Sequence, residues 1–391
     1  MAVAAGLDLE AARRLFAESQ DFTIGLEEEF AIVEPESLEL AHAFEEVYAM
    51  CAEDELLAQA AAGELIDTEI EIRSGRGEDF AHAMSMQLER RRRLFAVTDR
   101  LGYELAAMGT HPWASYLDQR IIDTDHYNLL SDQLRWVAQR NNTWSNHVHV
   151  GIRDADRAIA VCDYLRELLP PLLALSANSP FLDGHDTGLA SIRTQIFTRS
   201  FPRCGVHEPF GDWDTYAKFI ENLKRSGTVT EPTQLWWSVR PHHRFGTVEL
   251  RICDAQTDGD ESFGLAGLIG ASIVQSALDH DAGLLPAPLP GREVEENLWR
   301  AIRHGMDGQM IDWRGDCGLR DTRDVVAGLV EWSTPARERI QAPAPSLAPN
   351  GAQRARAAME AGADPAAVYR EAIAQTRRTY LARDASPRAG G

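Results

Sequence analysis

Polar and apolar residues alternate along four segments of the chain, at 22–33, 66–73, 145–152 and 246–253. Successive side chains of a β-strand point to opposite faces, so each segment has the pattern of a strand with one apolar and one polar face. The polar faces carry carboxylate, imidazole or guanidinium groups. In chain order these are Glu27 and Glu29, Glu69 and Glu71, His147 and His149, and Glu249 and Arg251. The repetition predicts four strands of one design.

Helical spacing of apolar residues occupies the stretches between these strands. The expected helices cover residues 8–19, 43–62, 79–105, 130–141 and 155–178. Pro170-Pro171 must kink or divide the last of them.

Other segments complete the expected order of elements. Residues 179–212, rich in Gly, Pro, Asp, Arg and His, are expected to form a long functional loop region. A further strand is expected at about 234–240, and helices dominate after 253, with a Pro-rich break at 343–349. Because strands and helices do not alternate as regular βαβ units, the order favours an α+β fold, with an antiparallel sheet and helices on one face.

The polar strand faces predict a metal site if the four strands share one sheet. Several carboxylates would then lie close together, which is unfavourable without compensation. Bound divalent cations would resolve the conflict, and oxygen ligands suit Mg²⁺ or Mn²⁺. The alternative is that each polar face meets water, as in many antiparallel sheets. Glu28 alone breaks the pattern, and we expect it near a sheet edge or paired with an arginine.

The charge balance narrows the function. A net charge of -21 argues against a nucleic-acid binder, which usually has a basic surface. Lys218 and Lys224 are the only lysines, so phosphates or carboxylates would be bound by arginine forks, although a GC-rich genome also explains the bias. The basic run Arg90–Arg93 is expected to be a solvated helix face. With no GxxxxGK[ST] motif, any ATP would be bound through metals and arginines.

The remaining composition indicates a soluble protein of the cytoplasm. The five cysteines are scattered without a CxxC pair, which argues against disulfides or a zinc knuckle. The first residues lack the basic region of a signal peptide, and no apolar run approaches the roughly 20 residues that a membrane span needs.

Five ordered motifs resemble the glutamate–cysteine ligase type 2 family, and within it the bacterial carboxylate–amine ligases. The motifs begin at Thr23, Asn146, Ala177, Ser191 and Trp237, and read TIGLEEEF, NHVHVG, ANSPF, SIRTQIF and WSVRP…GTVELRICD. The resemblance runs from about residue 20 to 310. It implies a glutamine-synthetase-like fold, in which a curved antiparallel sheet forms an active-site funnel with helices packed on the outer face. No composition shift demands a domain boundary, so we expect a single catalytic domain over 1–391, with a helical C-terminal extension at about 311–384 and a disordered tail at 385–391.

The resemblance also implies an ATP-dependent ligase with Mg²⁺ or Mn²⁺. In the family reaction, ATP phosphorylates the γ-carboxylate of glutamate to an acyl phosphate, and the amine of cysteine displaces the phosphate. The substrates of this chain are therefore expected to be a small carboxylate and a small amine, with no nucleic acid or membrane partner; a homodimer is possible by resemblance. The alternatives are a metal-dependent amidase or hydrolase and a non-catalytic nucleotide-binding relative.

Residue roles follow from the matched motifs. The expected metal ligands are Glu27, Glu29, Glu71, Glu249 and His147. The expected nucleotide contacts are His147, His149, Arg240 and Arg251. The expected catalytic residues are Arg251 as a clamp on the transferring phosphoryl group, Arg193 on a substrate carboxylate, and Glu69 as a substitute for Glu71 or as a candidate general base.

Overall fold

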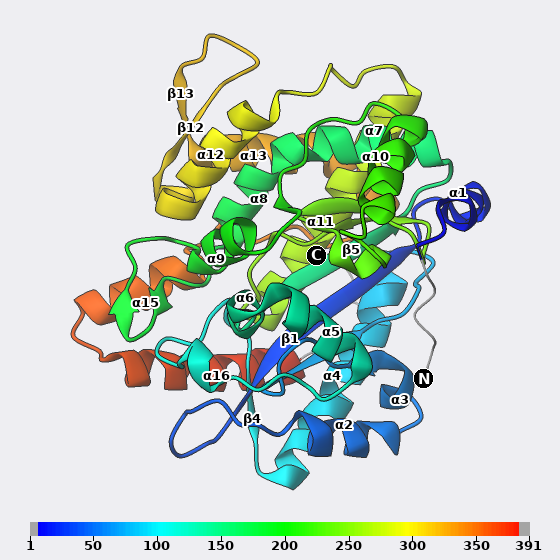
Figure 1. Ribbon diagram of the computed structural model, residues 1–391. Helices are drawn as coiled ribbons and strands as arrows, with labels where there is room; N and C mark the ends of the chain where they lie inside the picture. The colour runs from blue at the N-terminus through cyan, green and yellow to red at the C-terminus, as the bar shows by residue number, and fades with distance from the viewer. Residues whose placement is uncertain (1–6, 383–391) are drawn as a thin grey trace.

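The computed structural model describes residues 7–382, in which a seven-stranded antiparallel sheet lies at the centre (Figure 1). The strand order is β10-β11-β5-β1-β3-β2, with β4 also paired to β1. The strands are β1 (Ile24–Val33), β2 (Ala61–Ala62), β3 (Glu69–Arg73), β4 (Glu104–Ala106), β5 (Asn146–Gly151), β10 (Val239–His242) and β11 (Thr247–Leu250). All four predicted strands therefore lie in one sheet.

Six short strands form separate pairs. They are β6 (Phe181–Leu182) with β7 (His185–Asp186), β8 (Cys204–Gly205) with β9 (Trp236–Trp237), and β12 (Gln309–Ile311) with β13 (Leu319–Asp321). The last pair is a hairpin that projects at the upper left of Figure 1. It interrupts the C-terminal part of the chain, in which helices were expected to dominate.

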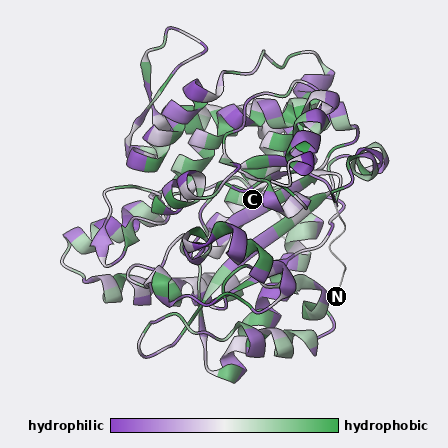
Figure 2. Cartoon of the chain, in the orientation of Figure 1, coloured by the Kyte–Doolittle hydropathy of each residue, from purple (hydrophilic) through white to green (hydrophobic). Residues whose placement is uncertain are grey.

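Helices surround the sheet. They are α1 (Leu9–Glu18), α2 (Phe44–Ala52), α3 (Leu57–Ala60), α4 (Phe80–Leu101), α5 (Asp125–Leu134), α6 (Trp136–Gln139), α7 (Ala155–Leu165), α8 (Leu169–Ser176), α9 (Ile192–Ser200), α10 (Trp213–Arg225), α11 (Gly259–Asp281), α12 (Gly291–His304), α13 (Thr322–Trp332), α14 (Thr334–Arg339), α15 (Gly351–Glu360) and α16 (Pro365–Leu381). Figure 2 shows many hydrophilic residues on surface helices such as α12, and both kinds of residue along the central strands.

The apolar face of the sheet packs against α4, α7 and α11, as the alternation predicted. Its residues are almost fully buried and include Val148, Val150, Val248 and Leu250. Helix α11 is the one helix among residues 7–382 that is long and apolar enough to span a membrane, but 83% of its apolar window is buried inside the fold. It is therefore the central core helix, whose burial stabilises the sheet by the hydrophobic effect.

Several helix predictions were wrong in their bounds. The helix expected at 43–62 is divided into α2 and α3, and its last residues instead form β2. The helix expected at 79–105 ends at Leu101, because Gly102 adopts a left-handed conformation with φ 83° and caps it. The chain then enters β4.

Two further differences lie around the active face. The helix expected at 130–141 begins earlier, at Asp125, and breaks at Arg135, whose φ is 52°. The segment 179–212 is not loop alone, since it contains α9, capped by the Ser191 side chain. The predicted division at Pro170-Pro171 is confirmed, with both prolines in the first turn of α8. The predicted tail at 385–391 lies outside the described residues.

Candidate active site

Strand pairing brings the predicted polar residues together on one face of the sheet. The residues that lie opposite each other are Glu27 with His147 and with Arg73, Glu29 with Glu71, His149 with Glu249, and Glu249 with Arg240. Apart from Arg73, these side chains belong to residues that are at least nine-tenths buried. The strand alternation read from the sequence thus produces one compact polar cluster.

His147 lies at the centre of the cluster. Its Nδ1 is 3.1 Å from a Glu27 oxygen and 4.0 Å from a Glu249 oxygen, and its Nε2 is 3.5 Å from a Glu29 oxygen. The burial of His147 lowers its pKa to about 4, so the ring is neutral at physiological pH. A neutral imidazole is a metal ligand as well as a hydrogen-bonding group.

Two groups of three residues have ligand atoms close enough to hold a cation. They are Glu27, His147 and Glu249, and Glu29, Glu71 and His147, each with its ligand atoms within 4.8 Å of one another. Both are rich in carboxylate oxygens, which suit Mg²⁺ and Mn²⁺. The five predicted metal ligands therefore form two overlapping groups that share His147.

The first group is charged and held in place by arginines. The Nε of Arg240 donates to Glu249 at 2.7 Å, and Arg251 also donates to this carboxylate. Burial raises the pKa of Glu249, but Arg240 and Arg251 outweigh it and hold the pKa well below its usual range. Burial likewise raises the pKa of Glu27, and His149 and His147 more than offset this. Both carboxylates are therefore ionised.

The second group contains carboxylates that lack sufficient positive charge. Burial and Glu71 raise the pKa of Glu29 to about 7, although Arg193 opposes the shift. Burial, followed by Glu29, also raises the pKa of Glu69. Neither side-chain oxygen of Glu69 has a hydrogen-bond partner among residues 7–382, although both are buried. Unpartnered buried oxygens beside a cluster of acids are what a bound cation or a proton donor of the substrate would satisfy, and the donor set of the two groups fits a divalent metal.

Two residues of the site were missed by the sequence analysis. Glu64 lies beside Glu71 and Glu29, and burial together with Glu71 raises its pKa well above normal. It precedes the alternating segment at 66–73, so the strand pattern did not include it. His242 of β10 stacks on Phe245, with ring centroids 4.3 Å apart. Its only sequence signal was its place between the strands expected at about 234–240 and at 246–253.

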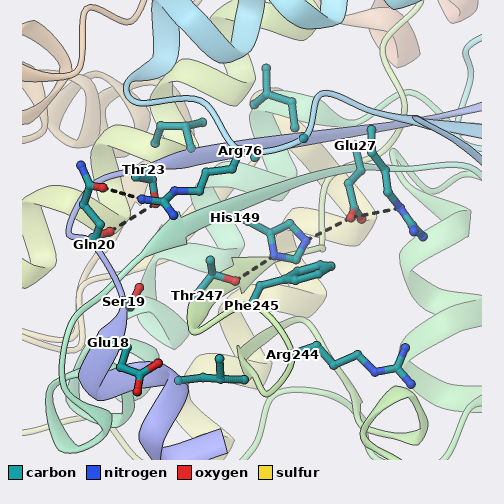
Figure 3. Close-up of a pocket in the computed structure, with 16 residues that line it drawn as sticks. Glu18, Ser19, Gln20, Thr23, Glu27, Arg76, His149, Arg244, Phe245 and Thr247 are labelled. Atoms are coloured by element: carbon teal, nitrogen blue, oxygen red, sulfur yellow. Dashed lines mark hydrogen bonds and ion pairs between the residues drawn. The ribbon is translucent and has the colours of Figure 1, made fainter. Parts of the chain in front are cut away.

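His149 lies close to both carboxylates of the first group, Glu27 and Glu249. Its Nε2 lies 3.3 Å from Glu27 and 3.8 Å from Glu249, and its Nδ1 is 3.0 Å from the Thr247 hydroxyl. Burial lowers the pKa of His149, but Glu249 and Glu27 raise it more. Figure 3 shows His149 between Glu27 and Thr247, with the Phe245 ring beneath it. Its predicted contact with a nucleotide stays a prediction.

Arg193 of α9 lies beside the site, but much of its guanidinium is already engaged. Its Nη1 donates to the carbonyl of Ile252 at 2.9 Å, and its Nη2 to that of Arg251 at 3.3 Å. It is also 3.7 Å from Asp254. These contacts fix the turn that follows β11, whereas its predicted contact with a substrate carboxylate stays a prediction.

Glu28 points to the opposite face of β1, as the alternation required. It is not at a sheet edge, since β1 lies between β5 and β3. Of the two expectations for it, the pairing with an arginine is confirmed: Arg91 Nε donates to it at 2.7 Å. The prediction that Arg90–Arg93 is a solvated face was wrong for Arg91, which is 1% exposed.

Comparisons with known proteins identify the family of the chain. The family described as glutamate–cysteine ligase family 2 (GCS2) matches residues 23–376. A protein of Rubrobacter xylanophilus with the provisional name glutamate–cysteine ligase 2-2 is 40% identical over 74% of both chains. A protein of Frankia casuarinae, provisionally named glutamate–cysteine ligase 2-1, is 38% identical over 83% of this chain and 85% of its own.

Solved structures show the same fold at low identity. A glutamate–cysteine ligase of Francisella tularensis, solved in complex with AMP, has a TM-score of 0.62 and 10% identity, covering 94% of this chain and 91% of its own. A bifunctional glutathione synthetase of Pasteurella multocida has a TM-score of 0.62 and 13% identity over 96% of this chain. This chain spans 54% of that longer protein.

These findings settle the fold and the family. The predicted glutamine-synthetase-like α+β fold, with an antiparallel sheet and helices on its outer face, is confirmed. The predicted class of enzyme, an ATP-dependent ligase that joins a carboxylate to an amine, is confirmed at the level of the family. The chain belongs to glutamate–cysteine ligase family 2.

Proposed function

We propose that this protein activates the γ-carboxylate of glutamate with ATP and joins it to an amine such as cysteine. The observation that carries the proposal is the pair of overlapping ligand groups around His147, flanked by Arg240 and Arg251. Phosphoryl transfer depends mainly on positioning and charge neutralisation, and this cluster is built for both.

The reaction has two steps. A carboxylate oxygen of the first substrate attacks the γ-phosphorus of ATP, ADP leaves, and an acyl phosphate is formed. The amine then attacks the acyl carbon, phosphate leaves, and the amine nitrogen gives up a proton. Mg²⁺ or Mn²⁺, when bound, would neutralise phosphate charge. Glu27, His147 and Glu249 would hold one ion, and Glu29, Glu71 and His147 a second.

The protein's own side chains supply the remaining requirements. The Arg251 guanidinium is oriented by its contact with Glu249, so its planar donors are positioned for phosphoryl oxygens. Glu69 offers two unpartnered oxygens and a raised pKa, which suit acceptance of a proton from an amine. This gives Glu69 a role that differs from simple metal ligation.

ADP release measured with each component omitted in turn tests the proposal. We expect ADP only when Mg²⁺ or Mn²⁺, glutamate and an amine are all present. In Glu249→Gln, we expect kcat/KM to fall by about a hundredfold or more, because a charge that neutralises and positions the metal is lost. The matched control, Glu34→Gln, changes an exposed carboxylate just beyond β1 and should retain activity.

Other results would contradict the proposal. Amine release from an amide without ATP would identify a metal-dependent amidase. Nucleotide binding without turnover across a broad amine panel would identify a non-catalytic relative. Mass spectrometry of the product identifies the amine that is joined.

A further inference from the structure

Arg193 of α9 lies close to the active site but is not open to it. The residue is 4% exposed. Two pockets of about 440 and 210 Å³ lie over the polar face of the sheet, and their described lining residues include Arg251 but not Arg193. The Nε of Arg193 has no hydrogen-bond partner among residues 7–382, but this atom is buried as well. The position of Arg193 therefore suits the support of Arg251 better than a direct contact with a substrate.

The guanidinium of Arg193 holds the backbone that carries Arg251. Its Nη2 donates to the carbonyl of Arg251 at 3.3 Å, and its Nη1 to the carbonyl of Ile252 at 2.9 Å. Both carbonyls lie just beyond Leu250, where β11 ends. On the other side of the same residue, the N–H of Arg251 donates to the carbonyl of Ser238 at 2.9 Å. Arg193 thus fixes the peptide units that follow Arg251.

Asp254 fixes Arg193 in turn. It is fully buried, and its Oδ1 lies 3.7 Å from the Nη1 of Arg193 and accepts from the Ser191 hydroxyl at 2.9 Å. Its Oδ2 accepts from the Ser179 hydroxyl at 2.6 Å and from the N–H of Asn178 at 2.9 Å. Burial raises the pKa of Asp254, and Arg193 is the first of the groups that oppose the rise. Asp254 therefore ties the start of α9 to the chain that follows β11.

The carboxyl group of Asp254 has little room to shift. A Cβ placed on Gly109 would lie 2.8 Å from the Cγ of Asp254 and 2.9 Å from the Cβ of Ser179. The backbone of Gly109 is itself held, since its N–H donates to the carbonyl of Asn178 at 3.1 Å. Close packing of this kind transmits a change in position to its neighbours. Asp254 is therefore a fixed point from which Arg193 is held.

The side chain of Arg251 depends on where its backbone lies. At its far end, the guanidinium of Arg251 contacts Glu249, one of the proposed metal ligands. At its near end, the backbone is fixed by Arg193. A group that stabilises a transferring phosphoryl must be placed to within a fraction of an ångström, and a misplacement of about 1 Å can cost about a hundredfold in rate.

We propose that Arg193 and Asp254 are positioning residues, which set the place of the Arg251 guanidinium for phosphoryl transfer. The assignment rests on the proposed function, since it concerns the first step of that reaction. It differs from the expected contact of Arg193 with a substrate carboxylate. The two roles have different kinetic effects, because loss of a transition-state contact lowers kcat, whereas loss of a substrate contact raises KM.

Arg193→Lys separates these two roles. The variant keeps the positive charge, but an ammonium group lacks the planar fork that donates to two carbonyls. ADP release is measured with ATP, Mg²⁺ and an amine while glutamate is varied. We expect kcat to fall about tenfold and the KM for glutamate to stay within about threefold of wild type. A tenfold rise in this KM with kcat unchanged would overturn the proposal and identify Arg193 as a substrate contact.

Asp254→Asn tests whether the effect passes through Arg251. The change puts an amide donor in place of one acceptor oxygen, and we expect kcat to fall about tenfold. In an Arg251→Lys background, which lacks the positioned guanidinium, the same change should lower kcat further by less than about threefold, since residues that act through one group are not additive. A tenfold loss in both backgrounds would show that Asp254 does not act through Arg251.

Asp163→Asn is the matched control for the loss of a buried aspartate. Asp163 of α7 is 1% exposed and accepts from the backbone N–H groups of Phe210 and Gly211. We expect this variant to lower the melting temperature, as Asp254→Asn should, but to keep kcat within about twofold of wild type. A tenfold loss of kcat in Asp163→Asn would mean that destabilisation alone explains the result at Asp254.

The outcomes also separate this proposal from the proposed function. If wild type releases no amine-dependent ADP, the proposed function fails. If wild type is active and both Arg193→Lys and Asp254→Asn turn over at its rate, the function stands and the positioning role is wrong. Melting temperatures show which variants are folded. If Asp254→Asn does not fold, Arg193→Lys in the Arg251→Lys background measures the same coupling, with the same expected loss of less than about threefold.

Discussion

Strand β1 carries carboxylates on both of its faces, and the protein treats the two faces differently. On the helix side, Glu28 accepts hydrogen bonds from Arg91, Gln87 and Ser262. Burial raises the pKa of Glu28, but Arg91 and the other two donors lower it by more than burial raises it. Glu28 therefore remains ionised. The positive partner is also supported, since the Arg91 guanidinium lies 3.6 Å from the centre of the Phe263 ring.

On the open side, which is the polar face of the sheet that carries the site, positive charge does not fully balance the carboxylates. Glu29, Glu64, Glu69 and Glu71 all have raised pKa values, and burial is the largest cause for each. A buried carboxylate without a partner costs free energy of folding, so such a cluster is retained where a ligand supplies the missing charge. The contrast teaches that burial of an acid is not itself a sign of function. What distinguishes the functional face is that only some of its acids, among them Glu27 and Glu249, have sufficient counter-charge from the described chain.

The largest expected effect is on the balanced face. Glu28→Ala leaves Arg91 buried and uncompensated, and we expect the free energy of unfolding to fall by about 3–5 kcal/mol. Guanidinium denaturation measures the loss, and Glu34→Ala, at an exposed acid just after β1, is the control. Replacing both partners, as Glu28→Leu with Arg91→Met, should recover much of the stability. If Glu28→Ala is as stable as wild type, the pair of Glu28 and Arg91 is not what distinguishes the two faces.

The contrast between the faces could be predicted from the sequence in part. Period-two alternation separated Glu28 from Glu27 and Glu29 without knowledge of the partners, because the geometry of a strand is local. The same rule placed His147 and His149 on one face. The fold class followed from the order of elements, and the family from the motifs.

The partners themselves could not be predicted. Arg91 was predicted to be solvated. The prediction failed because the burial of Arg91 depends on how α4 packs against β1, which is a tertiary property. Ser262 is 234 residues away from Glu28 in the chain. Glu64 lies outside any strand, so no periodicity selected it. Within the predicted segment 246–253, alternation puts Cys253 on the face of Glu249 and Arg251, but β11 ends at Leu250 and Cys253 is buried in the apolar core.

A smaller effect is expected in the pH dependence of stability and of metal affinity, which should come from the open face through Glu29. The raised pKa of Glu29, about 7, means that the metal-free fold holds a proton there which the unfolded chain releases at lower pH. This contribution to stability is complete below the unfolded pKa and is lost as pH rises through about 7. A metal must displace the same proton, so its apparent affinity should rise by about tenfold per pH unit below 7 for one displaced proton.

Thermal unfolding with and without Mg²⁺ or Mn²⁺ measures this dependence. We expect the increase in melting temperature caused by the metal to grow from pH 5.5 to pH 8. In Glu29→Gln that pH dependence should flatten, because the titrating ligand is gone. A metal-induced increase that is constant with pH would mean that the acids of the open face are already ionised without metal.

The smallest expected effect is at Glu69, where the contrast with Glu28 is sharpest. Glu69→Gln removes a buried carboxylate that has no hydrogen-bond partner among residues 7–382 and keeps the shape of the side chain. We expect the free energy of unfolding of the metal-free protein at pH 8 to rise by about 1 kcal/mol, because the substitution removes a buried carboxyl group whose ionisation the fold opposes. Denaturation in the presence of a chelator measures it, with Glu28→Gln as the matched change on the other face, where stability should fall. If Glu69→Gln is instead destabilising by a similar amount, the carboxylate is balanced within the folded chain, and Glu69 belongs with Glu28 and not with the metal site.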